Sequence, residues 1–300
     1  MPVIKTLIIG VLLFWTTGVH SQEGQWDWWN ELHGWEPGMP SWKRWLVISP
    51  GYLGPNALPV PEIKTGYIPE MSEVSFSGSR HFHPGDPTQD ISGRIFLPFA
   101  DSRIAFEAYG VILENYAFTE EIRDERFARD QDGRGITQGD LYFSTLIQVV
   151  RDRIFPNTLF RIAGRTASGG AYGAARYSDS PGYFFDFSFS KDIGAGRWSV
   201  VRPFASAGFY SWQTNDEYNL QNDAFFYGAG LEFKSPEWLV SGVYSGYSGY
   251  QKNRDKPSVL TFNLRHDWDY SAMALAMIVG LRHWDYYTIR VTYAWKFEGF

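Results

Sequence analysis

One short stretch of the sequence brings together residue types that bind metal ions. In "RHFHPGD", His81 and His83 are two residues apart, which places both on one face of a strand end, and Asp86 follows in the next turn. Imidazole nitrogens and a carboxylate are ligands for a divalent metal. The alternative is that the two rings pack against other side chains at a rim of the fold. We favour that alternative, so no metal site and no cofactor are predicted.

A second stretch is similar to a calcium-binding loop. Residues 129–140, "RDQDGRGITQGD", hold Asp130, Asp132 and Asp140 around two glycines. The ligand spacing and the closing Glu of such loops are absent, so a solvated acidic loop is the favoured interpretation.

Nucleophilic catalysis finds little support in the residues. There is no Gly-x-Ser-x-Gly elbow, no cysteine, and no His two residues before a Ser in the mature chain. No catalytic residue is therefore predicted, although a Ser–His pair from distant strands stays possible because catalytic partners need be close only in space.

The N-terminus predicts export. Lys5 precedes a short apolar core, residues 7–15, and Val19 and Ser21 stand at the small-residue positions for cleavage before Gln22. Residues 1–21 are therefore expected to be a signal peptide. Residues 22–71 follow as a Trp- and Pro-rich segment with little periodicity, expected to be either a plug or a periplasmic segment.

From residue 72 onward the chain alternates apolar and polar residues, which predicts strands. Aromatic residues make up 18% of the chain and glycines number 30, a composition that favours strands over helices. The predicted strands are 72–82, 89–99, 103–114, 141–151, 158–168, 182–191, 198–211, 223–234, 237–249, 258–268, 272–283 and 286–297. Their length suits a bilayer crossed at a tilt, and the intervening connections alternate between long and short.

The signal peptide, the amphipathic strands and the terminal Phe300 together resemble bacterial outer-membrane β-barrel proteins. The resemblance implies an all-β, antiparallel up-and-down barrel of about twelve strands over residues 72–300, located in the cell outer membrane. It also implies that Phe300 is the signal for the periplasmic insertion machinery. Phe300 is three residues after Phe297, out of phase with the apolar face, so it is expected to lie beyond the last strand. In strand count the chain is similar to nucleoside and acidic-oligosaccharide channels, autotransporter pores and lipid-hydrolysing barrels.

The faces opposite the apolar stripes are expected to line the lumen. Charged residues at these positions are Arg94, Glu107, Arg161, Arg165, Asp186, Arg202, Glu232, Arg265, Asp267, Arg282 and Arg290. Seven arginines against four acids favour anionic solutes in an open pore. Alternatively, the arginines pair with these acids, and with Asp27, Glu31 and Glu36 if the Trp-rich segment folds inside.

Three functions remain open on the sequence alone. The first is a porin-like channel for small polar or anionic solutes. The second is a non-conducting scaffold of an outer-membrane complex, with partner proteins at loop 115–140 or the N-terminal segment. The third is a lipid-modifying enzyme. Outer-membrane lipids and lipopolysaccharide are expected neighbours in each case, and the net charge of -6 gives no indication of nucleic-acid binding.

Overall fold

The computed structural model describes residues 26–151, 154–194 and 200–298. The expected signal peptide and Phe300 lie outside these ranges. The described residues divide into two compact units, with the division between Met39 and Pro40. The smaller unit contains a short helix, α2 (Asp27–His33), which ends at Gly34 in the left-handed conformation with φ of 62°.

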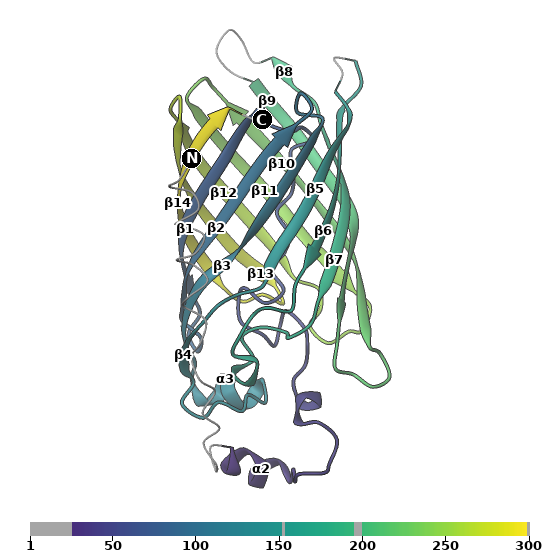
Figure 1. Ribbon diagram of the computed structural model, residues 1–300, viewed down its shortest axis with the longest axis vertical. Coiled ribbons are helices and arrows are strands. Elements are labelled where there is room, and N and C mark those ends of the chain that lie inside the picture. Colours follow the sequence, from purple (N-terminus) through teal and green to yellow (C-terminus); the bar gives the residue numbers. More distant parts are fainter. Residues whose placement is uncertain (1–25, 152–153, 195–199, 299–300) are drawn as a thin grey trace, which may run out of the picture. The chain divides into compact units, whose positions relative to one another are not determined.

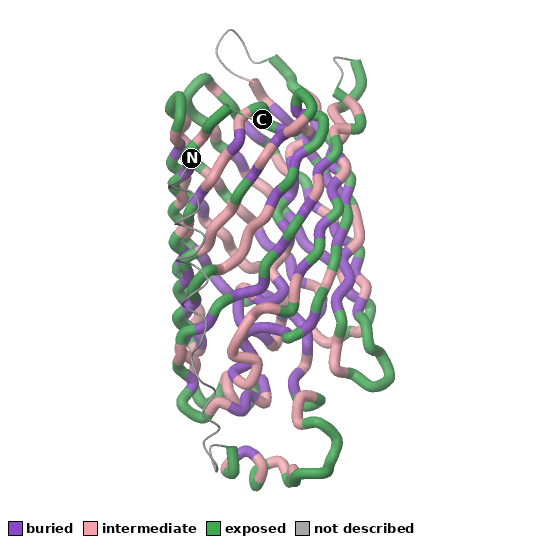
Figure 2. Tube along the Cα trace, in the orientation of Figure 1, coloured by how far each residue is buried: buried purple, intermediate pink, exposed green. Residues whose placement is uncertain are grey.

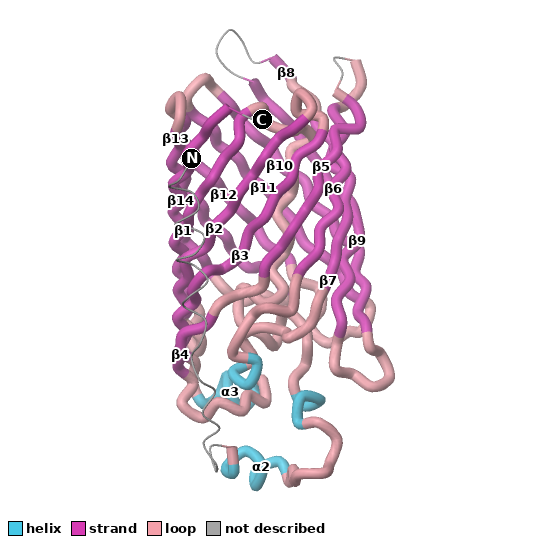
Figure 3. Tube along the Cα trace, in the orientation of Figure 1, coloured by secondary structure: helices cyan, strands magenta, loops and turns pink. Residues whose placement is uncertain are grey.

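The larger unit is a closed antiparallel barrel, built in its described residues from twelve main strands (Figures 1 and 3). Each strand pairs with the next one along the chain, and the last closes on the first with Met71 opposite Glu298. The strands are β1 (Met71–Phe82), β2 (Thr88–Phe99), β3 (Ile104–Ala117), β5 (Leu141–Val150), β6 (Asn157–Arg165), β7 (Gly182–Ser190), β9 (Val200–Gln213), β10 (Gln221–Lys234), β11 (Trp238–Gly249), β12 (Ser258–Asp267), β13 (Ser271–Arg282) and β14 (Tyr287–Glu298). The predicted fold class is therefore confirmed.

Alternation along each strand turns one set of side chains outward and the other inward. The outward faces are apolar, whereas the inward faces are polar on some strands and aromatic on others. On β14, the outward set Tyr287, Ile289, Val291, Tyr293, Trp295 and Phe297 is exposed, while Thr288 and Ala294 on the opposite face are buried. A closed sheet satisfies its backbone hydrogen bonds internally, and so large an outward apolar area suits hydrocarbon better than water. Within the described part of the chain, no helix has the length and apolarity needed to cross a bilayer.

The two ends of the barrel differ in their connections. The short-turn end has the connections 100–103, 151–156, 191–199, 235–237 and 268–270, including the two-residue strand β8 (Ile193–Gly194), which pairs with β9. The long-loop end has the connections 83–87, 118–140, 166–181, 214–220, 250–257 and 283–286. These long loops contain small elements that the sequence did not predict: the helix α3 (Glu120–Glu125), the strand β4 (Arg134–Thr137) paired with β3, and the 3-10 turn η2 (Tyr172–Ala174).

Residues 46–70, named here the inner segment, run through the barrel from the long-loop end to the short-turn end. They follow the 3-10 turn η1 (Trp42–Trp45), whose Lys43 forms an ion pair with Asp179 of a long loop. At the other end, the carbonyl of Pro69 accepts a hydrogen bond from Ser102 in a short turn, and β1 begins at Met71. Figures 1 and 2 show this largely buried stretch inside the ring of strands.

Candidate functional site

One side of the lumen is aromatic. Phe184, Tyr210, Trp212, Phe226 and Tyr247, from β7 and β9–β11, are fully buried in a single cluster. The cluster includes the apolar side chains of the inner segment: Leu46, Ile48, Leu53, Ala57, Leu58 and Ile63. Burial of this apolar surface stabilises the segment against the wall.

Aromatic hydrogen-bond donors also hold the main chain of the inner segment. The indole of Trp212 donates to the carbonyl of Ile48 at 3.0 Å, and the hydroxyl of Tyr247 donates to that of Leu58 at 2.8 Å. Prolines prevent this segment from forming a helix or a central strand, so its buried carbonyls need such side-chain partners.

The adjoining wall of the lumen, on β2, β3, β5 and β6, is charged. Lys64 of the inner segment donates to the buried carboxylate of Glu107 at 2.9 Å, and Ser144 donates to the same carboxylate. Arg94 pairs with Glu107 and, at 3.0 Å, with Glu62 of the inner segment. One acid and one base of the segment thus complement the wall.

Two further arginines join this wall to the inner segment. Arg161 is paired with Asp186 at 2.7 Å and donates to the carbonyl of Glu62 at 2.9 Å. Arg165 is paired with Asp140 at 3.1 Å and donates to the carbonyl of Ala57 at 2.7 Å. All four charged side chains are almost completely buried.

The short-turn half contains two more ion-pair groups. Arg202 pairs with Glu232 at 2.9 Å, and its guanidinium lies 4.0 Å from the ring centroid of Tyr67. Arg265 pairs with Asp267 at 2.9 Å and with Glu73 at 2.7 Å. Each of the four acids expected in the lumen therefore has an arginine partner.

Sequence reasoning omitted three acids that face the lumen: Glu73, Asp90 and Glu114. Glu114 is missed because a register shift between β2 and β3 leaves Ile112 as an extra residue. Such a bulge changes the phase, so that both Glu107 and Glu114 point inward. In the sequence, the bulge is visible only as two consecutive apolar residues, Ile112 and Leu113, both of which face outward. With these acids the arginine excess of the lumen becomes smaller than the sequence list indicates.

Arg290 differs from the other inward arginines. Its Nε donates to the hydroxyl of Ser79 at 3.1 Å, and within the described residues it has no acidic partner at ion-pair distance. The inward side chains around it on β12 and β14, Thr261, Asn263 and Thr292, are only partly buried. The inner segment reaches this wall at the long-loop end, where Val60 packs against the cluster of Val259, Trp284 and Tyr286. The inward residues further along the wall are partly accessible. Arg282 lies exposed at the long-loop end of β13.

A buried ionic cluster joins the long loops. Asp86 accepts from Arg126 at 2.7 Å and from Arg176 at 2.6 and 2.8 Å, and the hydroxyl of Tyr286 donates to it. Arg176 also donates to Glu114 at 2.8 Å. Burial alone raises the pKa of Asp86, but the charges of Arg176 and Arg126 outweigh it and hold the pKa below its ordinary value.

The residues first considered for metal binding have other partners. His81 contacts Thr288 at 2.7 Å and Asp90 at 2.6 Å, and its ring lies edge-on to Trp284 and Tyr286. Among the described residues, no three His, Asp or Glu side chains gather as a metal site would require. The rings of His81 and His83 therefore pack against aromatic rings at the long-loop end, as the favoured interpretation expected.

A closed, twelve-stranded antiparallel barrel with an apolar outer belt defines the class: an outer-membrane β-barrel protein. Among solved structures, the chain is similar to an outer-membrane channel from Pseudomonas putida F1, with a TM-score of 0.54 and 11% identity over 81% of this chain and 97% of that one. At this identity the likeness shows the fold alone.

Two other structures give lower scores, on which nothing is concluded. A KdgM porin in complex with disordered oligogalacturonate has a TM-score of 0.48 and 8% identity, over 75% of this chain and 99% of that one. The β domain of the Bordetella autotransporter BrkA has a TM-score of 0.41 and 10% identity, over 75% and 98%. No protein-family model and no curated protein matches the sequence.

Proposed function

We propose that the protein is a porin-like channel for small polar solutes, with a preference for anions, and that the inner segment and the long loops close it at rest. The observation that supports this most directly is the partly accessible inner wall of β12–β14. There Arg290 faces the lumen with no carboxylate at ion-pair distance among the described residues, and the nearby charge of Asp90 compensates it only in part.

The electrostatics of this wall favour anions. Arg265, Arg290 and Lys296 stand against Glu73, Asp267 and Asp90. Glu73 and Asp267 are engaged by Arg265 and Lys296, and Asp90, which lies in one row with Ser79 and Arg290, is hydrogen-bonded by His81 and Asn56. In a narrow lumen of low dielectric constant, a positive charge without a carboxylate at ion-pair distance attracts anions more strongly than it would in bulk water.

The closure is at the long-loop end. The Asp86 cluster ties the loops to one another, and the indole of Trp284 donates to the carbonyl of Pro55 in the inner segment at 3.0 Å. Thr288 and Val259, at the same end of the accessible wall, are buried. Opening therefore requires displacement of the inner segment, the loops or both.

Planar-bilayer conductance of three purified forms tests the proposal: the full mature chain, a deletion of residues 24–41, and a deletion of residues 24–65. The shorter deletion retains the inner segment and serves as the matched control. We expect the longer deletion to conduct steadily with anion selectivity, and the control to behave like the full chain. In the longer deletion, Arg290→Gln should move the reversal potential toward zero.

The alternative is a non-conducting scaffold. It is favoured by the pairing of Arg94, Arg161, Arg202 and Arg265 with lumen acids, because such a network stiffens a closed barrel. A scaffold would stay silent in the bilayer even without residues 24–65. Loop 115–140 and the N-terminal segment would then be the surfaces for partner proteins, to be identified by pull-down.

A further inference from the structure

A groove of about 510 Å³ runs along the outer surface of the barrel near the long-loop end, where β14, β1, β2 and β3 lie side by side. Its floor is Gly78, whose Cα partners are Val291 on one side and Ile91 on the other. A Cβ placed on Gly78 would meet no atom within 4 Å, so the absent side chain is what makes the hollow. This volume is in the range of small-molecule sites.

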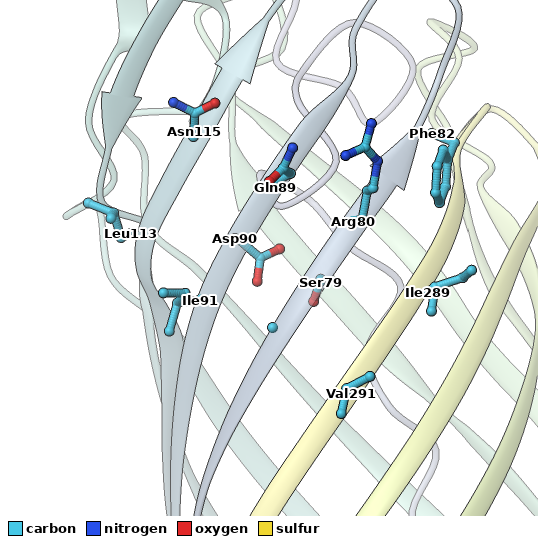
Figure 4. Close-up of a pocket in the computed structure, with 11 residues that line it drawn as sticks. Ser79, Arg80, Phe82, Gln89, Asp90, Ile91, Leu113, Asn115, Ile289 and Val291 are labelled. Carbon is cyan, nitrogen blue, oxygen red and sulfur yellow. The ribbon is translucent and has the colours of Figure 1, made fainter.

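The walls of the groove are apolar. Ile91, Leu113, Ile289 and Val291 line its sides and Phe82 its upper edge (Figure 4). All of them are outward residues of the belt, so the groove opens toward lipid. An unfilled hollow in hydrocarbon would lose dispersion contacts, and one acyl chain has the shape to fill it.

The long-loop end of the groove is polar. Arg80, Gln89 and Asn115 form one row across three strands, since Arg80 pairs in register with Gln89 and Gln89 with Asn115. Arg80 lies over the ring of Phe82, 5.2 Å from its centroid. Within the described residues, none of these three side chains has a hydrogen bond or an ion pair with another protein group, and all three are exposed.

A lone arginine on a lipid-facing surface is unfavourable at the bilayer midplane and tolerated near the headgroups. At the end of β1 it lies where a headgroup would be, with two amide donors beside it. Guanidinium groups bind phosphate through paired, charge-assisted hydrogen bonds. The row therefore complements an anionic phosphate placed directly above an apolar trench.

We infer that this groove is a binding site for one molecule of lipopolysaccharide, with an acyl chain over Gly78 and a lipid A phosphate on Arg80. The inference rests on the long-loop end facing the outer leaflet, and it is independent of whether the lumen conducts. The sequence predicted lipopolysaccharide only as a general neighbour, whereas this proposal assigns it to one groove on the barrel surface.

Native mass spectrometry of the purified full-length barrel with added lipid A tests the inference. Arg80→Gln should weaken lipid A retention about tenfold, the loss that one charge-assisted contact carries. Gly78→Leu should abolish retention by filling the trench. Two matched controls should bind like the wild type: Gly164→Leu, at another exposed glycine with open space around it, and Lys252→Gln, in an exposed loop at the same end.

A heat-modifiability assay on every variant confirms that each one folds. Equal retention by Gly78→Leu and Gly164→Leu would overturn the site. Phosphatidylglycerol bound as tightly as lipid A would overturn its assignment to lipopolysaccharide. A silent barrel in the conductance experiment would leave either result unchanged, so failure of the channel and failure of the lipid site are distinguishable.

Discussion

Asp86→Asn removes the charge at the centre of the loop cluster with almost no change in shape. Arg126 then loses its acidic partner, whereas Arg176 keeps Glu114. Both guanidinium groups are buried, and removing one member of a buried ion pair costs about 3–5 kcal/mol. Because Glu114 still compensates one arginine, we expect a loss near the lower limit, about 3 kcal/mol.

The same change has a defined pH dependence. The folded-state pKa of Asp86 is lowered, so its stabilising effect is present above the unfolded-state pKa, about 4, and is lost as the pH falls toward the folded-state pKa. In that interval the unfolded chain binds one proton more than the folded barrel. The wild type should therefore lose about 1.4 kcal/mol per pH unit relative to Asp86→Asn below pH 4.

Urea unfolding in lipid vesicles, followed by tryptophan fluorescence, measures both effects. Asp132→Asn is the control, because Asp132 is an exposed acid of the same loops. The reasoning is refuted if the two substitutions are equally mild at pH 7, or if the gap between wild type and Asp86→Asn widens as the solution is acidified.

Three further predictions concern assembly, topology and the lumen. Deletion of Phe300 should reduce the amount of heat-modifiable barrel without blocking secretion, as immunoblots of periplasmic and membrane fractions would detect; unchanged assembly would place the insertion signal upstream. An epitope at the exposed residues 131–132 should be labelled on intact cells and one at 235–236 should not, and the reverse pattern would invert the orientation. Lys64→Met and Glu107→Gln should each destabilise the barrel by less than the roughly 3 kcal/mol of a fully unpaired buried charge, because Arg94 still compensates Glu107 and Glu62 still compensates Lys64. The two losses should be less than additive when combined, since the double change removes both members of the pair, and strict additivity in urea unfolding would contradict their coupling.

The strands were predictable because the pattern that specifies them lies in neighbouring residues of the sequence. A period of two follows from the pleat, and each strand turns one face to hydrocarbon, so the pattern is present in the residues themselves. No observed end of a main strand differs from its expected position by more than three residues. The pairing of Arg161 with Asp186 could be anticipated in the same way, since both stand at inward positions.

The path of the inner segment was not predictable, because its conformation is imposed by distant residues. Pro50 and Pro55 exclude regular structure but do not indicate what replaces it. Three partners of its carbonyls come from β9, β11 and the loop before β14, more than 150 residues later. Two more, Arg161 and Arg165 of β6, come 99 and 108 residues later. The acid of residues 22–71 that pairs with Arg94 is Glu62, whereas Asp27, Glu31 and Glu36 belong to the separate N-terminal unit.

The direction of the inner segment has a consequence for biogenesis. The segment is continuous with β1 at Met71, and β1 forms the seam with β14, so the chain passes through the same ring that its next residues close. A ring that closed first would have to admit the bulky Trp42 and Trp45 through its whole length before they could reach the long loops. If β1 and β14 pair last, after the inner segment has packed against the aromatic wall, no such passage is needed. Closure of the seam and placement of the segment are thus a single topological event.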